Sequence, residues 1–98
     1  MKNAFSSYTL AKENHEKYLK IEKRDLLSLI EEQIGEAIEK GVYRTQFSYW
    51  TERDNLIEDL KEYAIEFLNG LGYRVRAIAE EGYRCNRLIL MINFEREE

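Results

Sequence analysis

Arginines and large apolar side chains supply the candidate binding residues of this chain. They lie on segments with the side-chain alternation of β-strands, so one face of a sheet could gather them. The protein is nevertheless acidic overall, with a net charge of -4. Guanidinium groups beside aromatic rings are typical of the energetic centres of protein interfaces, and their planar forks also suit phosphates. The alternative is that these arginines only solvate an open sheet face and pair with neighbouring glutamates. The candidate binding residues are Arg44, Trp50, Arg74, Arg76, Tyr83, Arg84, Arg87 and Met91.

Catalytic and metal chemistry have few of the residues they need. The single histidine, His15, follows the thin apolar stripe of an expected helix, which favours a packing or interface role over a general base. The single cysteine, Cys85, precedes an apolar strand with no base identifiable beside it, so we interpret it as a buried structural thiol. One histidine and one cysteine do not make a zinc site, and the acidic pairs lack a calcium-binding loop. We therefore predict no catalytic residues, no metal, no cofactor and no enzymatic activity.

The bulk properties set the class of protein. A length of 98 residues with 44% hydrophobic content predicts a single domain over residues 1–98. The lone cysteine excludes an intramolecular disulfide, and no apolar run reaches the length of a membrane span. We therefore expect a cytoplasmic protein without membrane contact. The acidic balance argues against general nucleic-acid binding, which relies on a basic surface.

Two helices are expected in the first part of the chain. Apolar residues recur at helical spacing over residues 25–40, and Gly41 suits the left-handed position that ends a helix. An earlier helix over residues 7–22 has an apolar stripe narrow enough to make it peripheral, and residues 1–6 are expected to fray. We predict a kink or short turn between the two helices near Lys23.

Strand and helix patterns alternate in the rest of the chain. A core helix should begin at Thr51, as its cap, and end in the NGLG run at 69–72. The Glu-Glu-Gly run at 80–82 predicts a short hairpin turn. Strands are expected at 42–50, 73–80 and 83–95.

These elements predict an α+β fold with the order α-α-β-α-β-β. The most apolar strand, the last, should take the centre of a three-stranded mixed sheet of order 1-3-2, with the helices on one face and a core over residues 25–95. The last strand would bury Leu88, Leu90, Ile92 and Phe94 against the helices. The opposite face would carry an apolar strip of Ile89 and Met91, joined by Ile78 and Trp50.

This strip predicts a homodimer or small symmetric oligomer, because soluble monomers rarely expose such surfaces. If the strip is the contact, replacing Met91 with Asp should dissociate the oligomer without unfolding the subunits. The stripe of the first helix, which includes His15, is a second candidate contact.

The chain resembles small uncharacterised α+β proteins encoded by bacteriophages and prophages. The matching features are IGEAIEKGVYRTQF at 34–47, LNGLGYRVRAI at 68–78 and LILMINF at 88–94. They are architectural and carry no site motif. The resemblance implies a protein that works in the cytoplasm of an infected bacterial cell.

Two functions follow from these observations as expectations. The first is a non-enzymatic protein that binds and modulates a host protein through a protein interface, since the chain has interface composition without catalytic components. The second is an oligomer that sequesters an anionic nucleotide through its arginine and aromatic residues.

Overall fold

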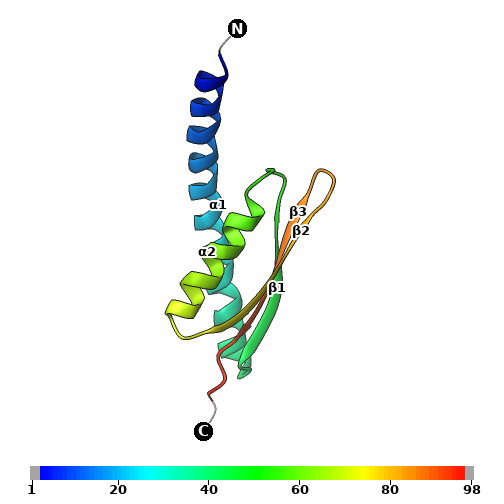
Figure 1. Ribbon diagram of the computed structural model, residues 1–98. Coiled ribbons are helices and arrows are strands. Elements are labelled where there is room, and N and C mark those ends of the chain that lie inside the picture. Colours follow the sequence, from blue (N-terminus) through cyan, green and yellow to red (C-terminus); the bar gives the residue numbers. More distant parts are fainter. Residues whose placement is uncertain (1–2, 97–98) are drawn as a thin grey trace.

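The computed structural model describes residues 3–96 and has two helices packed against one face of a three-stranded sheet (Figure 1). The α+β class and the strand order β1-β3-β2 are as predicted. The elements are α1 (Ala4–Lys40), β1 (Arg44–Thr51), α2 (Ile57–Gly70), β2 (Arg74–Glu81) and β3 (Asn86–Asn93).

The two helices expected before β1 are one continuous helix, α1, of 37 residues. The predicted break near Lys23 is wrong because no glycine or proline interrupts the region, and backbone hydrogen bonding continues through it. The helix also begins earlier than expected, since the side chain of Asn3 accepts a hydrogen bond from the amide of Ser6 at 2.8 Å. Of the residues expected to fray, 1–2 lie outside the described part. Gly41 ends the helix in the left-handed conformation, with φ 71°, as predicted.

The first half of α1 extends beyond the sheet, which makes the protein elongated, with extents of 62 × 27 × 18 Å (Figure 1). Contact with the core begins at Leu19 and continues through the buried residues Leu26, Ile30 and Ile34. Along residues 3–96, neither helix carries a stretch apolar enough to cross a bilayer.

The sheet is antiparallel throughout, which corrects the predicted mixed sheet. β1 and β2 both pair antiparallel with β3. They run in the same direction as each other, as a helical crossover between them requires, but β3 lies between them and they share no hydrogen bonds. No parallel pair of neighbours therefore exists in the described sheet.

The central strand packs its apolar residues as the alternation predicted. Leu88, Leu90 and Ile92 are buried against the helices, and Phe94 packs at the edge of the core. The aromatic face of β1, with Phe47 and Tyr49, also points to the helices. The contributions of the other elements to the core are Leu26, Ile30 and Ile34 from α1, Leu56, Ile57, Leu60, Ala64 and Leu68 from the α2 region, and Val75, Ala77 and Ala79 from β2.

Thr51 does not cap α2, contrary to the prediction. It is the last residue of β1, and its hydroxyl accepts a hydrogen bond from the amide of Arg53 at 3.1 Å. The chain then needs a left-handed residue, Asn55 with φ 64°, to turn back over the sheet. The helix therefore begins at Ile57, where the acidic residues Glu58 and Asp59 favour its positive end.

The β2–β3 connection is longer than predicted, because β2 continues to Glu81 and β3 begins only at Asn86. The amide of Gly82 donates a hydrogen bond to the carbonyl of Cys85 at 3.0 Å, which closes the turn. Arg84 has a left-handed backbone, with φ 66°.

Two glycine substitutions should change stability in opposite directions. A Cβ at Gly82 would lie 2.9 Å from the carbonyl oxygen of Cys85, so Gly82→Ala should lower the free energy of unfolding by about 1–3 kcal/mol. Gly35 lies within α1 with no atom near its Cβ position, so Gly35→Ala should raise it by about 0.5–1 kcal/mol. Urea denaturation of both variants at one protein concentration measures the two changes, and equal changes would contradict the turn geometry.

Candidate functional site

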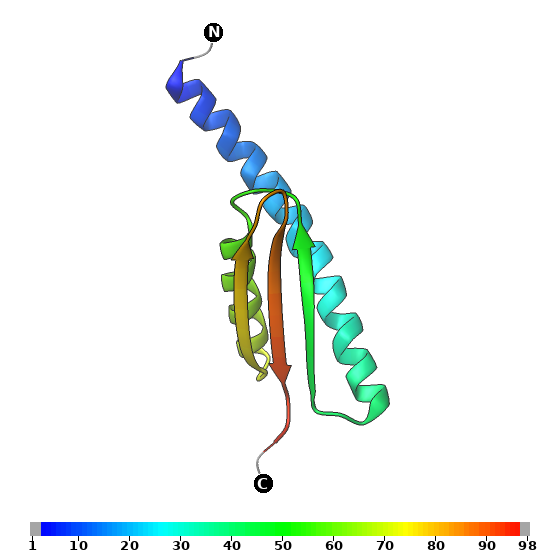
Figure 2. The same ribbon diagram turned by 90° about the vertical axis from the view of Figure 1, so that its right-hand side faces the viewer.

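The sheet face opposite the helices is the candidate binding face. Figure 2 shows the three strands in front, with α1 and α2 both behind them. Its residues form four rows that cross β1, β3 and β2 in that order. From the end of β3 towards its start, the rows are Arg44, Asn93 and Arg74; Gln46, Met91 and Arg76; Ser48, Ile89 and Ile78; and Trp50, Arg87 and Glu80.

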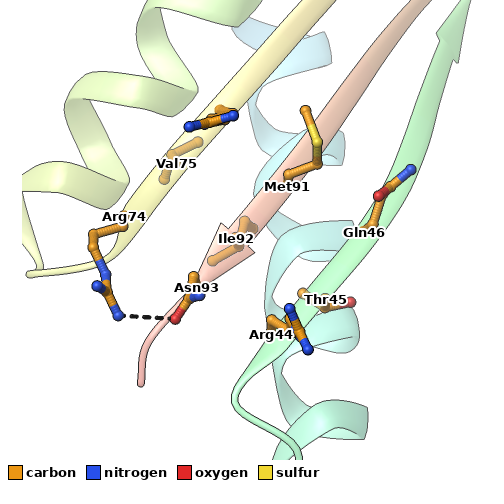
Figure 3. A pocket seen from close by; sticks show the side chains of 9 residues that line it. Arg44, Thr45, Gln46, Arg74, Val75, Met91, Ile92 and Asn93 are labelled. Atoms are coloured by element: carbon orange, nitrogen blue, oxygen red, sulfur yellow. Dashed lines mark hydrogen bonds between the residues drawn. The ribbon is translucent and has the colours of Figure 1, made fainter. Parts of the chain in front are cut away.

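The first two rows line a hollow of about 570 Å³ on this face (Figure 3). Met91 projects from the central strand between Gln46 on β1 and Arg76 on β2. The hollow therefore combines an apolar centre with amide and guanidinium groups at its margins. The complete lining is Arg44, Thr45, Gln46, Arg74, Val75, Arg76, Met91, Ile92 and Asn93.

The three arginines of the hollow differ in their hydrogen bonding. Arg74 donates to the side-chain oxygen of Asn93 at 3.0 Å and also to the backbone carbonyl of Glu95. Arg44 and Arg76 are exposed and form no ion pair with any residue from 3 to 96. These two guanidinium groups give the hollow a local positive charge within an acidic protein.

Trp50 and Arg87 lie together at the other end of the face. The guanidinium carbon of Arg87 lies 5.2 Å from the centre of the Trp50 ring. Its Nε donates to Oε2 of Glu80 at 2.9 Å, and its Nη2 donates to the same oxygen. Arg87 thus pairs with residues of its own chain, as expected if the arginines of this face only pair with neighbouring glutamates, whereas Trp50 remains 57% exposed.

Tyr83 and Arg84 do not join this face. Both lie in the connection between β2 and β3, so the expectation that Arg84 lies on a strand is wrong. The guanidinium carbon of Arg84 lies 5.1 Å from the centre of the Tyr83 ring, and both residues line a second hollow with Glu52 and Asp54. The eight residues of β3 span roughly 23 Å at about 3.3 Å per residue step, and this loop lies at the opposite end of the strand from the first hollow.

A polar cluster around Glu22 ties α1 to β1, and sequence reasoning missed it. Oε1 of Glu22 accepts hydrogen bonds from Thr51 at 2.8 Å and from Arg53 at 3.4 Å, and its Oε2 accepts one from the hydroxyl of Tyr49. Asn86 donates to the carbonyl of Arg53 at 3.1 Å. Across residues 3–96, no buried side-chain nitrogen or oxygen lacks a partner, so this cluster is internally satisfied and we interpret it as structural.

The two residues considered for catalysis lie in separate places. Nε2 of His15 lies 3.1 Å from Oδ2 of Asp59, which links α1 to the start of α2. Cys85 is half-buried in the β2–β3 connection, and its thiol faces the carbonyl of Asn86 at 4.0 Å, so it is less buried than predicted. Within the described chain, no group of three or more His, Cys, Asp or Glu residues could hold a metal ion.

Gln46 and Asn93 are further polar residues of the hollow that were not predicted. Strand alternation contains the signal, because Gln46 shares the face of Arg44 and Asn93 shares the face of Met91. Of the predicted site residues, the fold brings four to the hollow and two to the far end of the same face. Those at the hollow are Arg44, Arg74, Arg76 and Met91, and those at the far end are Trp50 and Arg87.

Comparison of the chain with protein-family models, curated proteins and solved structures finds no match.

Proposed function

We propose that this chain is a non-enzymatic binding protein whose open sheet face holds a protein partner. The observation that carries the proposal is the hollow around Met91, in which Arg44 and Arg76 have no acidic partner among residues 3–96. A partner that places an apolar side chain on Met91 and carboxylates beside the arginines would match both features.

The apolar part of the face supports the same proposal. Trp50 and Ile78 are 57% and 47% exposed, and Ile89 and Met91 on the central strand are half-buried. An aromatic ring, a methionine and arginines form a composition that is enriched at protein interfaces. Its position on a rigid sheet lets it bind without the ordering cost that a flexible loop would carry.

The kind of partner is proposed from the architectural resemblance to phage and prophage proteins alone. We propose a modulator of a host protein in the bacterial cytoplasm. Occupying the partner's surface requires no turnover, which agrees with the separation of His15 from Cys85 on different elements.

The test is to capture partners from a bacterial lysate with the immobilised wild-type chain and with Met91→Asp. Met91→Asp places a charge at the centre of the hollow and should weaken binding of the captured protein at least about tenfold. Ser28→Asp adds the same charge on the exposed surface of α1 and should bind as the wild type does. Equal binding by the wild type and Met91→Asp, or equal loss in both variants, would refute a partner site on the sheet face.

A second candidate function is binding of an anionic nucleotide, which the clustering of Arg44, Arg74 and Arg76 around one hollow favours. A specific nucleotide should raise the melting temperature in a concentration-dependent way, and Arg44→Ala should reduce that shift. Lys12→Ala, on α1, is the control. A flat response across a panel of nucleoside mono-, di- and triphosphates would exclude this function.

A further inference from the structure

The outer edge of β2 is regular and has no backbone partner among the described residues. The strand pairs with β3 without a bulge from Arg74 to Glu81, and β3 covers only one of its sides. Natural edge strands are commonly protected by charged side chains, especially lysine, by proline or by a bulge. The sequence of β2, RVRAIAEE, contains no lysine or proline, and the charges on its open face have both signs, so Arg76 of one copy can pair with Glu80 of another.

The hairpin hydrogen bond identifies which backbone groups point outward from this edge. The amide of Gly82 bonds to the carbonyl of Cys85, so these two residues form a hydrogen-bonded pair in the ladder. Hydrogen-bonded and non-hydrogen-bonded pairs alternate along antiparallel strands. Residues Arg76, Ile78 and Glu80 therefore direct their amides and carbonyls to β3. The backbone groups of the residues between them point outward, and these residues are Val75, Ala77, Ala79 and Glu81.

We propose that two copies of this chain pair through β2, antiparallel and centred on Ile78, to form one six-stranded sheet. A two-fold axis at Ile78 places Arg76 of each copy opposite Glu80 of the other and Ile78 opposite itself. These are non-hydrogen-bonded pairs, in which opposed side chains lie closest. The outward backbone groups of Ala77 and Ala79 then bond to each other across the axis.

The charges and exposure on the open face fit this register. Arg76 has no ion pair among residues 3–96, and Ile78 is 47% exposed. Both hydrogen bonds from Arg87 go to Oε2 of Glu80, so Oε1 of Glu80 remains available to a second guanidinium. Pairing would cover Ile78 and neutralise Arg76. The other edge strand, β1, has no acid on its open face and so offers no equivalent self-complementarity.

The proposal differs from self-association through the Ile89 and Met91 strip, because it leaves the β1 and β3 part of the open face, with Arg44, Gln46 and Met91, available to a partner. It does not rest on the proposed function, because it is argued from the backbone and register of β2, although Arg76 and Ile78 belong to both surfaces. Met91→Asp, which tests the face, should leave the dimer intact.

The test uses two charge reversals, Arg76→Glu and Glu80→Arg, measured by sedimentation equilibrium. The wild type should sediment at twice the 11.8 kDa mass of the chain. Each reversal places like charges opposite each other in both symmetry-related pairs, and should raise the dimer dissociation constant at least about tenfold. An equimolar mixture of the two variants restores opposite charges at both pairs and should form a heterodimer.

Three outcomes would overturn the proposal. One is a wild type that stays monomeric at millimolar concentration, and another is a mixture that dissociates as readily as either variant alone. The third is dissociation by Met91→Asp while the reversals have no effect, which would assign the contact to the open face. Circular dichroism of each variant separates dissociation from loss of the fold.

Discussion

Replacing Leu90 with alanine should lower the free energy of unfolding by about 2–5 kcal/mol. Leu90 lies in the middle of β3 with 0% of its surface exposed, opposite Phe47 on β1 and Ala77 on β2. The substitution removes buried methyl groups and leaves a cavity that two flanking strands and two helices cannot close fully. A domain of this size has a total stability of about 5–15 kcal/mol, so the loss is a large fraction of it.

The matched control for Leu90 is its neighbour Met91, which points to the open face. Met91 is half-buried, so Met91→Ala should cost about 1 kcal/mol. Urea denaturation at one protein concentration measures both variants, because self-association would make stability depend on concentration. Equal losses would mean that the two faces of β3 are equally buried, contrary to the arrangement of the helices.

Replacing Glu22 with alanine should lower the free energy of unfolding by about 2–4 kcal/mol. The carboxylate is nearly buried and accepts hydrogen bonds from Tyr49 and Thr51, whose hydroxyls would lose their acceptor. Arg53 would also lose its acidic partner. Glu22→Gln keeps the shape and one acceptor oxygen, so it should cost less, about 1 kcal/mol.

The control for Glu22 is Glu31→Ala, an exposed residue of the same helix that should change stability by no more than about 0.5 kcal/mol. Tyr49→Phe and the double variant with Glu22→Ala complete a cycle that isolates the interaction between the two side chains. A cost for Glu22→Ala as small as that for Glu31→Ala would show that the cluster does not hold α1 to β1.

Local patterns accounted for most of the secondary structure and for the sheet faces. Leu90 and Met91 were assigned to opposite faces from alternation alone. The structure agrees, because Leu90 is buried and Met91 lies half-buried on the open face. The error at Thr51 has a cause that is not local. Thr51 has the chemistry of a helix cap, but it is the last residue of β1, and its hydroxyl donates to Glu22, a contact 29 positions away that the adjacent sequence does not reveal.

The candidate site was predicted in its residue types and only partly in its grouping. Arg44 and Arg76 were assigned to one face correctly, whereas Tyr83 and Arg84 were grouped with them although their loop lies at the far end of the sheet. The signal for Glu22 was present, because it falls on the same helical face as Leu19 and Leu26. A carboxylate on an apolar stripe needs a buried partner, but its spacing does not name the partner.

By itself, the sequence determined which side of each element is apolar, because side-chain direction follows from the period of the local backbone. Only the tertiary structure decided which residues of the three strands lie side by side in each row. Strand register places Arg44 and Arg74 on either side of Asn93. The placement of α1 against β1 brings Glu22 to residues 27 and 29 positions away. Register is set by hydrogen bonds and packing between segments far apart in the chain, and no local period encodes those contacts.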